Sequence, residues 1–112
     1  MIEEIMAEAG IPYREGFYPR LPDDATCAVY VDDCETDGPD RIDAQMAAAM
    51  PCIYRHNVHI EVYEAKRDAA AEAALEASIR ARGLDYKKQG REWLSDVQRY
   101  LINYEISYAV KK

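Results

Sequence analysis

The sequence predicts a single small α+β domain, in which one main helix packs on one face of an antiparallel or mixed β-sheet. Apolar and polar side chains alternate over residues 58–63 and again over 100–110, which is typical of half-buried strands. An alanine-rich segment with helical periodicity lies between Asp68 and Gly83. Strands in runs, without regular β-α-β alternation, favour helices gathered on one face of the sheet.

The chain of 112 residues is long enough for one domain, spanning 1–112, and too short for two. Its net charge of -7 is uneven, because residues 1–50 carry twelve acidic and three basic side chains. An acidic chain without a basic stripe is a poor candidate for binding nucleic acid. Neither a signal peptide nor a membrane span is evident, and three cysteines without a C-x-x-C pair suit a reducing compartment. We therefore expect a cytoplasmic protein.

The first half of the chain begins with a predicted short amphipathic helix over 2–9, which Gly10 ends. Residues 13–18 are expected to be extended, and a strand is predicted over 26–31. The strongly acidic segment 32–43 is predicted to be an exposed turn or loop.

Residues 36–52 are expected to form a loop or a mobile arm. Three interpretations of 42–50 stay open: a helix, favoured by its alanines and methionines, a mobile arm, or the first half of a hairpin. Pro51 disfavours a helical conformation at the residue before it.

The main helix is predicted over 69–82, with Asp68 as its N-cap and Gly83 as its C-cap. We expect an apolar stripe to face the sheet: Ala71, Ala74, Leu75, Ser78 and Ile79. The opposite side of the helix is expected to carry Glu72, Glu76 and Arg80, the last two at a favourable i, i+4 spacing. A short strand is predicted over 84–89, before a turn at Gly90.

Candidate chemical groups are few. Acidic residues from Asp33 to Asp37 imitate the start of an EF-hand loop, but Ala44 stands where a bidentate glutamate is needed, so a solvated loop is favoured. His56 and His59 would point to opposite faces of a strand and could not chelate one metal together. With no recognisable catalytic motif around the cysteines or elsewhere, neither an enzyme nor a cofactor is expected.

Protein contacts are the remaining candidate function. Two interpretations of Trp93 stay open: a partner anchor, helped by the nearby Arg91, or a side chain that closes one end of the core. The candidate interface residues are Asp32, Asp33, Glu35, Asp37, Arg91 and Trp93.

The central stretch resembles small tail-completion proteins of siphophages and prophages, the tail terminator family. The resemblance is carried by the strand V-H-I-E-V-Y at 58–63, the charged turn ending at Asp68, the following helix, and G-L-D-Y at 83–86. A closing tyrosine-rich strand and the opening helix before A-G-I-P at 9–12 fit the same pattern. It covers most of the chain, while residues 36–52 look longer and richer in alanine than that pattern.

The resemblance implies a subunit of a hexameric ring that caps the tail tube and mediates head–tail joining. Its partners would be further copies of itself, the tail tube protein and head–tail connector proteins, without nucleic-acid recognition or a membrane. It would be assembled in the bacterial host cytoplasm and reside in the virion tail. The alternative hypothesis is a small acidic protein-binding module, an inhibitor or nucleic-acid mimic, suggested by the carboxylates of residues 1–50.

Overall fold

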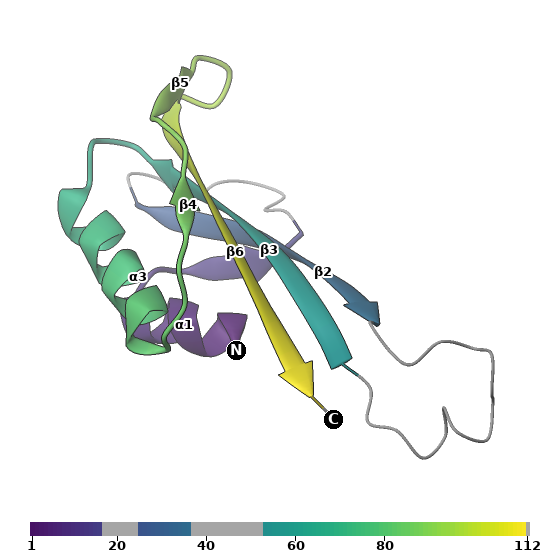
Figure 1. Ribbon diagram of the computed structural model, residues 1–112. Helices are drawn as coiled ribbons and strands as arrows, with labels where there is room; N and C mark the ends of the chain where they lie inside the picture. Colours follow the sequence, from purple (N-terminus) through teal and green to yellow (C-terminus); the bar gives the residue numbers. More distant parts are fainter. Residues whose placement is uncertain (17–24, 37–52, 112) are drawn as a thin grey trace, which may run out of the picture.

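The computed structural model describes residues 1–16, 25–36 and 53–111, and these form two helices and six strands (Figure 1). In chain order they are α1 (Ile2–Ala9), β1 (Tyr13–Glu15), β2 (Cys27–Thr36), β3 (Ile53–Glu64), α3 (Ala69–Ala81), β4 (Lys87–Lys88), β5 (Glu92–Leu94) and β6 (Arg99–Lys111). The predicted α+β class is confirmed, and both predicted helices are present.

The strands form one mixed sheet in the order β1-β2-β3-β6-β4, and β5 also pairs with β6. Only β1 and β2 are parallel, and every other neighbouring pair is antiparallel. The two longest strands, β3 and β6, pair over residues 53–64 and 100–111 in the middle of the sheet. Both helices lie on one face of this sheet, so the domain has two layers (Figure 1).

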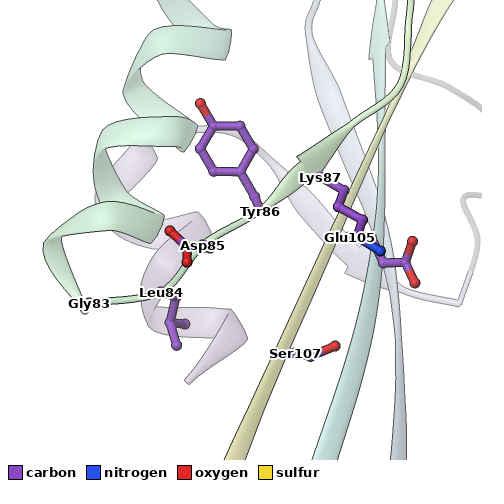
Figure 2. A pocket seen from close by; sticks show the side chains of 7 residues that line it. All are labelled: Gly83, Leu84, Asp85, Tyr86, Lys87, Glu105 and Ser107. Carbon is purple, nitrogen blue, oxygen red and sulfur yellow. The ribbon is translucent and has the colours of Figure 1, made fainter.

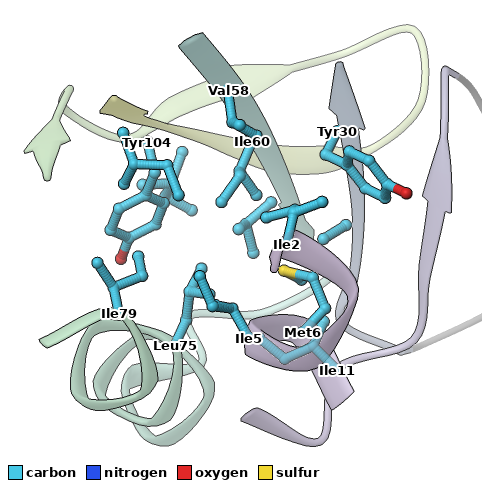
Figure 3. Close-up of a cluster of buried hydrophobic side chains, with 14 residues drawn as sticks. Ile2, Ile5, Met6, Ile11, Tyr30, Val58, Ile60, Leu75, Ile79 and Tyr104 are labelled. Atoms are coloured by element: carbon cyan, nitrogen blue, oxygen red, sulfur yellow. The ribbon is translucent and has the colours of Figure 1, made fainter. Parts of the chain in front are cut away.

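The hydrophobic core fills the space between the helices and the sheet (Figure 3). The alternation predicted for β3 is confirmed, because Val58, Ile60 and Val62 are fully buried. The other buried apolar side chains of this cluster come from both helices, the segment after α1, and strands β2 and β6: Ile2, Ile5, Met6, Ile11, Ala28, Tyr30, Leu75, Ile79, Ile102, Tyr104 and Ile106. The core therefore joins segments from both ends of the described chain.

Helix α3 begins at the predicted Ala69 and ends at Ala81, one residue before the predicted end, with Arg82 rather than Gly83 as its C-cap. The Asp68 carboxylate accepts a hydrogen bond from the backbone N–H of Ala71 (3.0 Å) and another from the Thr26 hydroxyl (2.5 Å), which ties the helix to the start of β2. Gly83, just after the helix, has a φ of +72°, a left-handed conformation that favours glycine.

Two predicted boundaries are wrong. The acidic segment 32–43 is not a loop from its start, because β2 continues to Thr36. Residues 32–36 pair in antiparallel register with residues 54–58 of β3, and this pairing overrides the low strand propensity of aspartate and glutamate. The strand predicted over 84–89 is limited to β4, and the predictions for 17–18 and 37–52 concern positions outside the described residues.

Candidate functional site

The candidate site is the part of the sheet that extends beyond the helices. It consists of residues 33–36 of β2, 53–57 of β3 and 107–111 of β6, which we call the blade. In Figure 1 these strand ends run toward the lower right, past the helical layer. No described side chain of the blade is buried, although the adjoining Val58 and Ile106 are core residues. The blade is therefore sheet without a core of its own.

Both outer strands of the blade have an edge without a partner strand among the described residues. On one side, β1 pairs with β2 only from Ala28 to Tyr30. On the other side, the pairing of β4 with β6 reaches only to Glu105. Exposed strand edges carry backbone N–H and C=O groups that are ready to pair with another chain. The blade therefore has two edges at which a further strand could pair.

The predicted acidic interface residues do not all lie on the same face of the sheet. Asp33 and Glu35 are exposed and lie on the face opposite the helices. Asp32 lies on the helix side, where its carboxylate contacts Nδ1 of His56 at 2.9 and 3.0 Å. Asp37 lies outside the described residues. Of the three carboxylates in the described residues, Asp33 and Glu35 therefore share one exposed face.

A thiol, an imidazole and a carboxylate meet on the helix side of the blade. His56 Nε2 lies 3.7 Å from the Sγ atom of the exposed Cys34, while its Nδ1 atom contacts Asp32. The ring of Tyr108 stacks on that of His56, with centroids 4.7 Å apart. Burial raises the pKa of the Tyr108 phenol, and the charges of Asp32 and Cys34 add to the rise.

This order of groups could activate a nucleophile. Nδ1–H of His56 would donate to Asp32, which leaves Nε2 able to take the proton of the Cys34 thiol. The sequence did not reveal this contact, because Cys34 and His56 are separated by 21 residues. They meet because β2 and β3 pair with Cys34 directly opposite His56.

Arg91 does not lie on the blade. It forms ion pairs with Glu72 of α3 and with the fully buried Glu64 at the end of β3. Burial raises the pKa of Glu64 to about 7, and the neighbouring Glu72 carboxyl, which accepts a hydrogen bond from it, adds to the rise. Among the described residues, Glu64 Oε2 has no hydrogen-bond partner. Arg91 therefore takes part in an ion cluster with α3 and the end of β3.

The expectation that Glu72 and Glu76 occupy the side of α3 away from the sheet is wrong, whereas Arg80 is exposed as expected. Glu72 is buried, and Lys88 lies 2.9 Å from both carboxylates. Glu76 also accepts hydrogen bonds from two phenols of the sheet side, which with Lys88 lower its pKa to about 2 despite its partial burial. The i, i+4 spacing of Glu72 and Glu76, read together with the later Lys88 and Arg91, was the available signal for this ion cluster.

Trp93 lies in β5, and its side chain is 47% exposed. The interpretation that it closes one end of the core is therefore wrong. Its ring makes an edge contact with Tyr100 of β6 at 4.8 Å between centroids. A half-exposed tryptophan supported by a second aromatic ring is compatible with a partner anchor.

Together these features define a two-layer α+β domain with a projecting sheet as its candidate interface. No protein-family model matches the chain, and the search of curated proteins finds no matching sequence. In the described parts of the chain, no group of three or more His, Cys, Asp or Glu side chains is placed to hold a metal ion. Neither α1 nor α3 has the length and apolar character that crossing a membrane requires.

Proposed function

We propose that the protein is a structural subunit of a phage tail, a tail-completion or terminator protein that acts through protein contacts. The observation that carries the proposal is the blade, a three-stranded sheet with exposed faces and two strand edges that no described strand covers. Soluble monomers usually protect such edges. In a subunit that extends its sheet with a strand of a neighbour, these strand edges would be covered on assembly.

The sequence supports the same proposal independently. The resemblance to tail terminators is carried by the strand at 58–63, the capped helix and G-L-D-Y at 83–86. These segments belong to the part of the domain from which the blade projects. In this function the protein forms a ring, proposed to be a hexamer, that caps the tail tube and offers a surface to the head–tail connector. It is assembled in the host cytoplasm and resides in the virion tail, and it needs neither a cofactor nor a reaction.

Light scattering coupled to size-exclusion chromatography tests the proposal. We expect a homo-oligomer with a mass several times the 12.8 kDa of one chain, and a complex when tail tube protein is added. Tube polymerisation, followed by electron microscopy, should stop early in its presence, with tube protein alone as the control. A monomer at every concentration that neither binds tube protein nor shortens tubes would refute the proposal.

A second candidate function, a nucleophilic thiol, is favoured by the contacts among Cys34, His56 and Asp32. In a Cys52→Ser background, we expect iodoacetamide to alkylate Cys34 at pH 7, with buried Cys27 as a slow internal reference. His56→Gln should slow alkylation of Cys34 by about tenfold, because the variant removes the acceptor of the thiol proton. Mass spectrometry of the modified chain measures both rates, and equal rates in the two proteins would exclude activation of this thiol.

A further inference from the structure

We propose that neighbouring copies join the β2 edge of one blade to the β6 edge of the next, so that the sheet continues from subunit to subunit. The inference rests on the proposed function in one respect, namely that the protein acts as an oligomer. It adds which two surfaces meet, in which direction the strands run, and which side chains lie opposite each other.

The topology fixes the direction of this pairing. Both β2 and β6 are antiparallel to β3, so they run parallel to each other within one subunit. Copies related by rotation about an axis along the strands would therefore pair β2 with β6 in parallel. The two edges also begin and end together, because Val31 is level with Glu105 across β3, and Thr36 is level with Val110. Two open edges of equal length thus face opposite sides of one blade.

The side chains at the two edges favour this unlike pairing. The β2 edge presents the exposed carboxylates of Asp33 and Glu35, so pairing β2 with another β2 would bring like charges together. The corresponding positions of β6 are the small, uncharged Ser107 and Ala109, which accommodate a neighbouring strand. Residues 111 and 112 are lysines, and their positive charge is opposite in sign to that of the carboxylates at the β2 edge.

A surface pocket marks the start of the β6 edge (Figure 2). It measures about 350 Å³ and forms where the chain after α3 diverges from β6, between the segment 83–87 and residues Glu105 and Ser107. Val31, at the start of the β2 edge, is 45% exposed although it is a large apolar residue of a strand. Pairing in the level register places Val31 of one copy beside Glu105 of the next, at the rim of this pocket, where Leu84 offers apolar surface. The valine and the pocket therefore meet in position, with Leu84 as an apolar residue of the lining.

Such an interface uses different surfaces on its two sides, and each copy has one of each. Heterologous contacts of this kind generate closed rings when the rotation between copies closes, and filaments when it does not. A continuous sheet also leaves the helical layer of every copy on the same side. The inferred contact is therefore compatible with a ring.

Disulfide trapping tests the contact directly. In a Cys34→Ser/Cys52→Ser background, the pair Asp33→Cys and Ser107→Cys should give a ladder of covalent multimers on mild oxidation, seen by non-reducing electrophoresis. Either cysteine alone should give no ladder and few dimers. The pair Glu4→Cys and Arg67→Cys, both exposed and off the blade, is the matched control. Dimers formed by Ser107→Cys alone would show that β6 pairs with β6, and would overturn the inference.

Charge reversal provides a second measurement that does not require oxidation. Asp33→Lys/Glu35→Lys should weaken self-association at least about tenfold in sedimentation experiments, whereas Glu3→Lys/Glu4→Lys, with the same charge change on α1, should not. Circular dichroism establishes that each variant is folded. A wild-type monomer would refute the proposed function itself. A wild-type oligomer that gives no ladder and tolerates Asp33→Lys/Glu35→Lys would refute only the edge pairing.

Discussion

Leu75→Ala is expected to lower the free energy of unfolding by about 3 kcal/mol, within the usual cost of emptying a fully buried leucine site. Leu75 has no exposed surface and lies between α3, α1 and the sheet (Figure 3). The cavity would have little room to collapse, because α1 is fixed against α3 by the hydrogen bond from the Ser78 hydroxyl to the Ile5 carbonyl (2.9 Å). Urea unfolding followed by circular dichroism measures the loss.

Leu101→Ala is the matched control for this measurement. Leu101 lies on the face of β6 opposite the helices and is only half-buried, so the same truncation should cost about 1 kcal/mol. Equal losses at Leu75 and Leu101 would contradict the assignment of the core to the helix side of the sheet.

The protein is expected to be less stable at pH 8 than at pH 5, and Glu64→Gln is expected to remove much of that difference. Burial raises the pKa of Glu64 from 4.5 to about 7 in the folded state, so the folded protein binds the proton more tightly than the unfolded chain. The stability gained from this proton is present below pH 4.5 and is lost as the pH rises to about 7, by up to about 3 kcal/mol. Thermal unfolding at both pH values measures the change.

The sign differs for Glu76, whose pKa is lowered to about 2, so its contribution is lost only as the pH falls below 4.5. It therefore adds nothing to the difference between pH 5 and pH 8. At pH 8 Glu64→Gln should be more stable than the wild type, because the amide keeps a donor toward Glu72 without a buried charge. Glu4→Gln, at an exposed position of α1, should leave the pH dependence unchanged. A Glu64→Gln protein with the wild-type pH profile would show that Glu64 is already ionised at pH 5.

Local patterns in the sequence predicted an element well where its own side-chain alternation or capping residue determines it. Alternation identified β3 and β6, and the capping carboxylate of Asp68 located the start of α3. These signals depend on neighbours within a few residues, so no knowledge of the rest of the fold was needed.

Contacts between distant segments were not predicted, because they depend on residues far away in the sequence. The acidic residues 32–36 form a strand because β3 lies beside them, and Glu72 is buried because Lys88 and Arg91 neutralise it. The meeting of Cys34 with His56 likewise depends on strand register, which composition does not specify. The blade is assembled from such contacts, and of the described candidate interface residues Asp33 and Glu35 lie in it.

The position of strand β6 in the sheet also affects the order of folding. It is the last described element of the chain, yet it lies between β3 and β4 and contributes Ile102, Tyr104 and Ile106 to the core. Its partner β3 is more than 30 residues away in sequence, so a large chain loop must close before the two strands meet, and such pairings form slowly. Until then β3 exposes an apolar edge that invites aggregation. The β6 edge that we propose for assembly therefore arises only when the core itself is complete, so an unfinished subunit would lack that edge.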